Sequence, residues 1–211
     1  LMALVSGYQR FASEQFWVTQ SVLAKIFVSL LACAGLIYLG PHGWRKFQEY
    51  AWLHRAEKAK NNPSEKLAAL QKAAEIEPKN ADTVYTVGEI FRLRSWLGED
   101  DYEKWANEAL PWFERGFKLN PRNPYNYISY GMCLDWIGRH DEAAPYFERA
   151  TALDPNSYYT ALHHGWHFVQ LRDYPQAEPW MVRAVNLGWV KSAWEYWVLV
   201  EQKLAEEKKV K

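Results

Sequence analysis

The histidine-rich stretch ALHHGWHFVQL, residues 161–171, holds the side chains of this sequence that are best suited to chemistry. His163 and His167 are four residues apart, which places both imidazoles on one face of a helix. Two such imidazoles could begin a metal site, but a structural zinc ion needs four protein ligands and a catalytic one usually needs three. The sequence has no HExxH motif, and its other histidines lie in distant parts of the chain. We therefore predict that the chain holds no metal ion.

Motifs of catalysis and cofactor binding are absent from the sequence. None of GxxxxGK[ST], GxGxxG or GxSxG occurs, so neither a phosphate-binding loop nor a nucleophile elbow is indicated. The 25 basic and 25 acidic residues give a formal net charge of zero, and no overall field attracts nucleic acid. Cys33 and Cys133 are too far apart for a CxxC pair. We predict a protein that is not an enzyme, uses no cofactor and binds no nucleic acid.

Residues 16–40 contain an apolar run of membrane-spanning length. Between Ser21 and Leu39 only Lys25 is charged, and about twenty apolar residues are what a helix needs to cross the hydrocarbon core. A buried helix of a soluble domain is one alternative. A signal peptide is another, but the mixed composition of residues 1–15 argues against it, because a signal peptide begins with a short basic segment. We expect an N-terminal flank at 1–15 and a transmembrane helix at 16–40.

Basic residues are more frequent after this run than before it. Arg45 and Lys46 follow it closely, whereas Arg10 alone precedes it. Cytoplasmic flanks of membrane helices carry an excess of Lys and Arg. The predicted location is therefore a membrane, with the C-terminal part of the chain on the cytoplasmic side.

From residue 47 onward the sequence repeats with a period of 34 residues. The stretch EALPWFERGFKLNP at 108–121 corresponds to EAAPYFERATALDP at 142–155. Columns of proline, arginine, aromatic residues and glycine keep the same period: Pro111, Pro145 and Pro179; Arg115, Arg149 and Arg183; Trp112, Tyr146 and Trp180; Gly131 and Gly165. A fixed period of this length indicates stacked units that share one continuous core.

The unit resembles the tetratricopeptide repeat in its length and in its signature residues, which are Tyr127, Tyr130, Gly131, Leu134, Gly138, Ala143, Phe147, Ala150 and Pro155. The resemblance implies an all-α fold, a TPR-type α-solenoid of helix pairs, here preceded by one transmembrane helix. The expected units are a degenerate first repeat at 47–80, a second with nine inserted residues at 81–123, a third at 124–157, a fourth at 158–191 and a capping helix at 192–211.

Local signals predict where the helices of the third unit begin and touch. Asp141 is a suitable N-cap, which would place Pro145 near the first turn of its helix, where a missing N–H costs least. Gly131 is the small residue at which the two helices of the unit are expected to approach most closely.

The repeat also explains the histidines. His164 shares its column with Tyr130 and Val87, a position that packs inside a helix pair. His163 and His167 fall in the columns of Ser129 and Cys133 of the preceding unit. The periodic pattern accounts for these positions without a metal ion.

The resemblance implies that the first helix of each pair lines a concave groove for a protein or peptide ligand. By register the groove residues are Tyr85, Glu89, Arg92, Tyr125, Ile128, Met132, Asp135, Trp136, Tyr159, Leu162, His163, Trp166 and Gln170, with Trp166, Tyr125 and Tyr159 at the centre. Family members that hold the acidic tails of chaperones use Lys, Asn and Arg in the groove, and this sequence does not. Aromatic rings suit peptide side chains or the face of a sugar, although each ring could instead pack between units.

Three functions fit these features. The first is a membrane-tethered TPR scaffold for protein–protein interaction. The second is the accessory C-terminal TPR domain of a polytopic glycan enzyme, because an O-antigen ligase or polymerase of similar arrangement ends in a membrane helix followed by repeats. Several further hydrophobic runs upstream of residue 1 would support this second function. The third is a soluble peptide- or glycan-binding module, which requires residues 16–40 to pack on the repeats.

Overall fold

The computed structural model describes residues 22–59, 62–98 and 101–210, and within these ranges the chain forms helices and turns without strands. The expected flank at 1–15 and the first part of the expected membrane helix, residues 16–21, lie outside the described residues. The chain divides into two compact units, Leu1–Gln48 and Glu49–Lys211. The all-α solenoid expected from the repeat is confirmed.

Helix α2 (Val22–Lys58) contains the apolar run. The sequence predicted a membrane helix ending at 40 and a repeat starting at 47, but α2 continues through both positions with Pro41 inside it. An interior proline removes one main-chain hydrogen bond and crowds the carbonyl group four residues earlier, but the helix continues through Pro41. By length and composition this helix could cross a membrane, a test that a soluble core helix and a signal sequence also pass. Its most apolar window is not buried anywhere in the structure.

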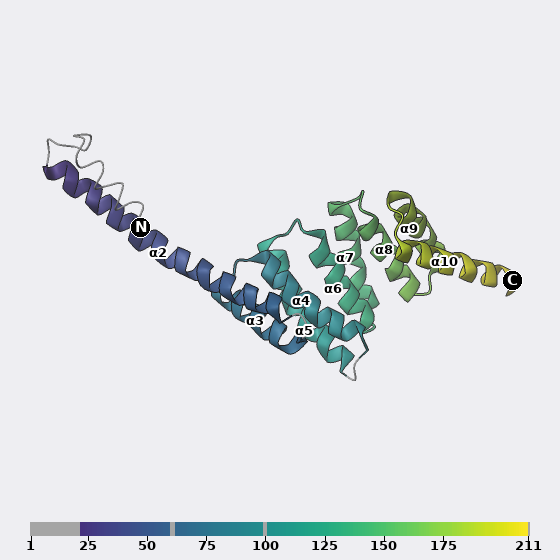
Figure 1. The fold of residues 1–211 in the computed structure, drawn as a ribbon. Helices are drawn as coiled ribbons and strands as arrows, with labels where there is room; N and C mark the ends of the chain where they lie inside the picture. Colours follow the sequence, from purple (N-terminus) through teal and green to yellow (C-terminus); the bar gives the residue numbers. More distant parts are fainter. Residues whose placement is uncertain (1–21, 60–61, 99–100, 211) are drawn as a thin grey trace. The chain divides into compact units, whose positions relative to one another are not determined.

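The second unit is built from antiparallel helix pairs (Figure 1). α4 packs on α5, α6 on α7 and α8 on α9, while α10 packs on α9 and ends the series. The first helices of successive pairs also touch, because α4 contacts α6, α6 contacts α8 and α8 contacts α10. The bounds are α3 (Pro63–Ile76), α4 (Ala81–Trp96), α5 (Tyr102–Leu119), α6 (Pro124–Trp136), α7 (His140–Leu153), α8 (Tyr158–Gln170), α9 (Tyr174–Leu187) and α10 (Lys191–Val210).

The nine inserted residues lengthen the pair α4–α5 rather than forming one long loop. α4 has 16 residues where α6 and α8 have 13, and α5 has 18 where α7 and α9 have 14. The connection between α4 and α5 takes up the remainder. The insertion therefore extends both helices by about one turn, and it carries Trp96 at the end of α4.

The cap expected for α7 was wrong. α7 begins at His140 with Arg139 as its N-cap residue, and Asp141 lies in the first turn instead. Pro145 is consequently an interior residue, as are Pro111 in α5 and Pro179 in α9. An acidic residue near the start of a helix is favourable there through the helix dipole, so Asp141 stabilises α7 without capping it.

The arginine column joins neighbouring units. Nη2 of Arg115 donates to the carbonyl oxygens of Ala74, at 3.1 Å, and of Pro78, at 2.7 Å. Nη2 of Arg183 donates to the carbonyl oxygen of Pro155 at 2.6 Å. Both arginines satisfy carbonyl groups at or beyond the C-terminal end of the second helix of the preceding unit, which accounts for arginine at these two positions.

Candidate ligand-binding pocket

His164 is a packing residue, as its column predicted. Its side chain is buried, and its ring stacks on Trp180 with the two centroids 4.1 Å apart. Nδ1 of His164 lies 3.1 Å from Oγ1 of Thr151. Because that hydroxyl donates its hydrogen to the carbonyl oxygen of Phe147 at 2.9 Å, it accepts the hydrogen bond from His164. The contact joins α7 to α8 across the boundary between units.

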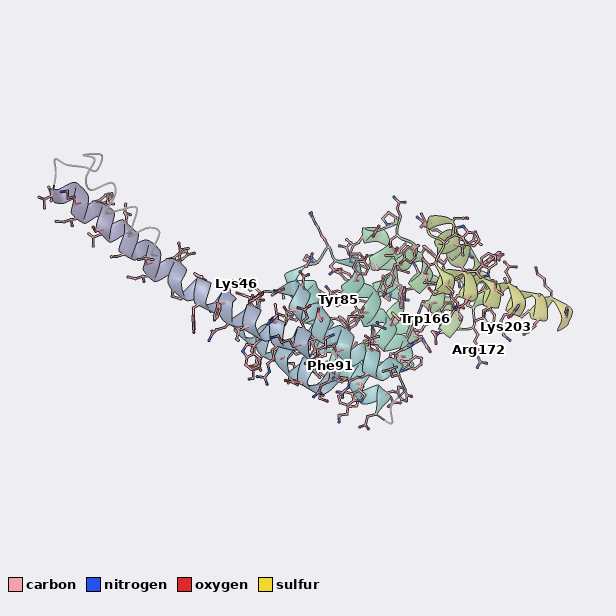
Figure 2. All side chains as sticks on the ribbon, viewed as in Figure 1. Lys46, Tyr85, Phe91, Trp166, Arg172 and Lys203 are labelled. Atoms are coloured by element: carbon pink, nitrogen blue, oxygen red, sulfur yellow. The ribbon has the colours of Figure 1, made fainter. Side chains whose placement is uncertain are left out.

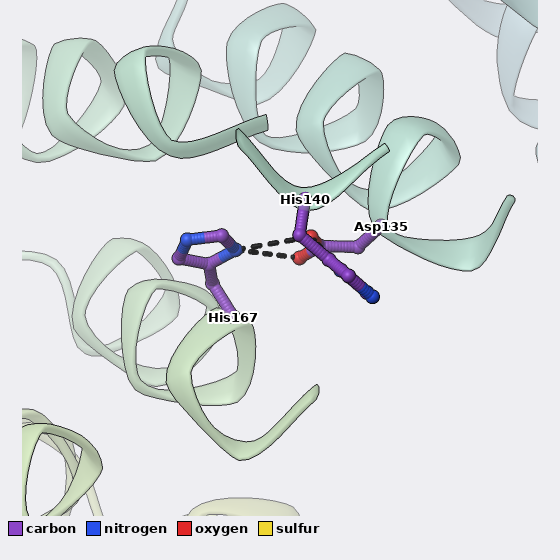
Figure 3. Close-up of polar contacts among 3 residues, drawn as sticks. All are labelled: Asp135, His140 and His167. Atoms are coloured by element: carbon purple, nitrogen blue, oxygen red, sulfur yellow. Dashed lines mark hydrogen bonds and ion pairs between the residues drawn. The ribbon is translucent and has the colours of Figure 1, made fainter. Parts of the chain in front are cut away.

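His167 is held by a buried carboxylate (Figure 3). Its Nδ1 lies 3.0 Å from Oδ1 and 2.9 Å from Oδ2 of Asp135. Nδ1 of His140 lies 2.9 Å from Oδ1 of the same carboxylate. A carboxylate only accepts hydrogen bonds, so both imidazoles carry hydrogen on Nδ1. The cluster ties the end of α6 to the start of α7 and to α8.

His163 lies apart from the cluster of Asp135, His140 and His167, and it lines a pocket of about 310 Å³. Its Nδ1 donates to the carbonyl oxygen of Tyr159, one turn earlier on α8, at 2.8 Å. The two rings are in contact, with centroids 4.0 Å apart. The lining comes from α4, α6, α8, α10 and the connection before α10: Trp96, Met132, Tyr158, Tyr159, Leu162, His163, Trp166, Val190, Ser192 and Tyr196.

Five of the expected groove residues come together in this pocket, and Tyr125 lies beside it. Met132, Tyr159, Leu162, His163 and Trp166 all line it, and the ring of Tyr125 is 5.4 Å from that of Tyr159. Trp166 is only 3% exposed and Tyr125 is 43% exposed. Trp166 is therefore part of the pocket floor, and Tyr125 stands at its edge. Tyr85 and Trp166, labelled in Figure 2, lie on α4 and α8.

Glu89 and Arg92 of the expected groove bind each other. Nε and Nη2 of Arg92 donate to the two carboxylate oxygens of Glu89, each at 2.8 Å. Their side chains are 18% and 12% exposed, so this ion pair is largely shielded from solvent. Tyr85 is half-buried beside them, and burial raises the pKa of its hydroxyl. The two charges of this pair therefore neutralise each other.

Ile128 and Asp135 were expected to line the groove, but the side chains of both are buried. Ile128 is 0% exposed, because it packs in the core between helix pairs. Asp135 is 3% exposed, because its carboxylate accepts from the two histidines. Trp136 and Gln170 are half-buried and line a second, more open hollow with His140, apart from the aromatic pocket. Trp136 also donates from Nε1 to the carbonyl oxygen of Ser95 at 3.2 Å.

Half of the pocket lining was missed by the sequence argument: Trp96, Tyr158, Val190, Ser192 and Tyr196. Trp96 lies in the insertion, where the period of 34 gives no register. Ser192 and Tyr196 lie beyond the last repeat, where the capping helix α10 was expected only to cover the end of the solenoid, and Val190 lies in the connection just before α10. α10 contacts α8, and this contact places Ser192 and Tyr196 in the pocket lining.

The environments of His163 and His164 predict acid sensitivity. Burial is the largest cause that lowers the pKa of His163 and of His164 to about 4, whereas an unfolded chain has the ordinary histidine value of about 6.5. Between these values the unfolded chain binds more protons, so the free energy of unfolding falls as the pH falls. We expect a loss of roughly 4 kcal/mol between pH 7 and pH 5 from the two rings together, measured by denaturant unfolding, and about half of that loss in His164→Phe. An equal free energy at both pH values would contradict the burial of these rings.

Comparison with known proteins supports the fold. A family model described as the tetratricopeptide repeat matches residues 125–157, and no curated protein matches the chain. A solved structure of a thermophilic TPR protein from Thermus thermophilus is similar with a TM-score of 0.62 and 14% identity, covering 74% of this chain and 81% of that one. The Sgt2 TPR domain from Aspergillus fumigatus gives 0.54 and 17%, covering 61% and 82%. The MamA protein gives 0.57 and 16%, covering 77% and 89%. The chain thus carries a tetratricopeptide repeat within a helical solenoid of the fold that TPR proteins share.

Proposed function

We propose that this chain is a membrane-tethered TPR scaffold that binds a protein or peptide partner in the aromatic pocket and catalyses no reaction. The observation that carries the proposal is the pocket itself, about 310 Å³ between the first helices of successive units. This volume is at the lower end of what ligand sites occupy. Its lining is aromatic and aliphatic with few polar groups, which suits the anchoring side chains of a partner.

The tether is supported by the exposure of α2. A helix of this hydropathy within a soluble core would be mostly buried, whereas large apolar side chains of this helix are exposed along its length, Leu23 at 78% and Ile37 at 75%. Contiguous apolar surface of this extent is rare on soluble monomers, and burial in lipid removes it from water. The basic residues Arg45 and Lys46 after the run favour a cytoplasmic location for the repeats.

The whole chain should sediment with membranes and need detergent to dissolve, because its apolar helix must leave water. A fragment of residues 44–211 should stay soluble and helical, since the second compact unit begins at Glu49. Ultracentrifugation of both proteins followed by circular dichroism measures this. A whole chain that remains in the supernatant as a monomer would refute the tether.

Truncating Trp166 should abolish partner capture. We expect Trp166→Ala to weaken the affinity for a partner isolated from detergent-solubilised membranes by about 30-fold or more, the effect of losing a binding hot spot. Affinity is measured with the whole chain immobilised, and a thermal melt confirms that the variant is folded.

Trp189→Ala is the matched control, because Trp189 is 83% exposed and is not part of the pocket lining. It should bind as tightly as the wild type. Unchanged capture by a folded Trp166→Ala protein would move the partner to another surface and end the proposed function of the pocket.

A further inference from the structure

The aromatic pocket has no charged group among its lining residues in the described part of the chain. Five of the ten lining side chains are aromatic rings other than histidine, namely Trp96, Tyr158, Tyr159, Trp166 and Tyr196. An enclosed apolar cavity of about 150 Å³ holds a benzene molecule. At about 310 Å³, this pocket has room for one aromatic side chain and some of the main chain that carries it.

Besides the hydroxyl groups of its tyrosines and of Ser192, the pocket lining contains one ring nitrogen that can accept a hydrogen bond but not donate one. His163 uses Nδ1–H to donate to the carbonyl oxygen of Tyr159 at 2.8 Å, which fixes the tautomer. Burial lowers the pKa of His163 to about 4, so the ring is neutral at pH 7. Nε2 then carries a lone pair, and within the described residues no hydrogen bond to Nε2 is formed. A neutral ligand group with an N–H or O–H can fill this position.

Anionic groups are poorly matched to the pocket. The nearby pair Glu89 and Arg92 is bidentate, and each charge already has its partner. A ligand carboxylate or phosphate would lose its hydration here without gaining a counter-ion, which is costly. The lining therefore selects against an anionic occupant.

We propose that the pocket accepts an uncharged aromatic side chain with a hydrogen-bond donor, such as tyrosine, from the partner, and that the donor bonds to Nε2 of His163. The inference rests on the proposed function and adds the chemistry of the anchor. Phenylalanine fits the rings but leaves Nε2 without a donor. Phosphotyrosine brings charge, and a sugar brings several hydroxyl groups to a lining that is mostly aromatic and aliphatic.

The test uses the whole chain in detergent and four probes, whose binding is followed by NMR titration: N-acetyltyrosinamide, N-acetylphenylalaninamide, N-acetyl-O-phosphotyrosinamide and methyl glucoside. The tyrosine probe should bind about threefold to tenfold more tightly than the phenylalanine probe, the usual effect of one hydrogen bond. The phosphorylated probe and the glucoside should not bind measurably.

His163→Phe should remove the difference between the tyrosine and phenylalanine probes while keeping a ring in place. His54→Phe is the matched control, because His54 is exposed on α2 outside the pocket, and it should preserve the difference. A readout on the wild type avoids any folding defect of the variant: in ¹⁵N-histidine-labelled protein, the Nε2 resonance of His163 should move on addition of the tyrosine probe only.

Equal affinity for the two aromatic probes, or tighter binding of the phosphorylated probe or the glucoside, would overturn the inference. Its failure is distinct from failure of the proposed function. If the probes do not discriminate but Trp166→Ala still loses the partner, the pocket binds a partner by another anchor. If Trp166→Ala keeps the partner, the proposed function fails whatever the probes show.

Discussion

Replacing Gly131 with leucine should lower the free energy of unfolding by about 3 kcal/mol or more, the upper range for overpacking a core. A Cβ atom at Gly131 would lie 2.8 Å from Cε2 and 3.0 Å from Cζ of Phe147. The ring of Phe147 is 1% exposed, so it cannot turn into solvent. α6 and α7 must therefore separate to admit the larger side chain. Gly88 and Gly165 have the same relation to Phe113 and Met181, which shows that the close approach recurs in each pair.

Thermal and denaturant unfolding of the whole chain in detergent measure this effect. Gly43→Leu is the matched control, since it is also a helical glycine but has nothing within 4 Å of its Cβ position. It should leave the unfolding of the repeats unchanged. Because neighbouring units share interfaces, the loss in Gly131→Leu should spread to the pairs on both sides. A melt identical to that of the wild type would mean that the packing of α6 on α7 is not as described.

Asp135→Ala should cost about 3 kcal/mol of stability. The substitution leaves the Nδ1–H groups of His140 and His167 without their acceptor, and the side chain of His167 is 2% exposed. A buried donor that loses its only partner incurs the full desolvation penalty, and the vacated volume adds a cavity cost. The hydrogen bonds that are lost join α6, α7 and α8, and α6 and α8 also line the pocket.

Asp141→Ala is the comparison for this variant. Asp141 is an exposed acidic residue in the first turn of α7, so its removal should change the free energy of unfolding by about 0.5 kcal/mol or less. Equilibrium unfolding of the two variants under the same conditions distinguishes the loss of the contacts of Asp135 with the two histidines from the general effect of removing a negative charge. Equal free energies for Asp135→Ala and Asp141→Ala would contradict a structural role of the carboxylate.

The repeat predicted the fold because its columns record packing that recurs in every unit. Gly131 and His164 keep their period because a close helix approach and a packing position recur with it. Arg115 and Arg183 share a bond to the carbonyl end of the preceding unit. The helix pairs and their order follow from such columns. The uninterrupted α2 was missed because the span and the first repeat were predicted as separate segments, and the start of α7 was predicted two residues too late, which placed Pro145 too near the first turn.

The candidate site was only half predictable for a different reason. Register assigns a residue to the inner row of helices but does not show which neighbour covers it. Asp135 is on that row and is buried by His167, 32 residues away in sequence. Trp96 and Tyr196 enter the pocket from the insertion and from α10, where the period does not extend. Pairing between single residues of different units leaves no periodic signal.

Site-specific photocrosslinking tests most directly whether the partner binds in the aromatic pocket. A photoreactive benzoylphenylalanine at Ser192, which lines the pocket, is compared with the same group at Arg149, an exposed residue of α7 outside the lining. Both proteins are irradiated in detergent-solubilised membranes. We expect a discrete crosslinked partner from position 192 that disappears when Trp166→Ala is added, and none from position 149. Crosslinking from position 149 with none from position 192 would contradict binding of the partner in the pocket.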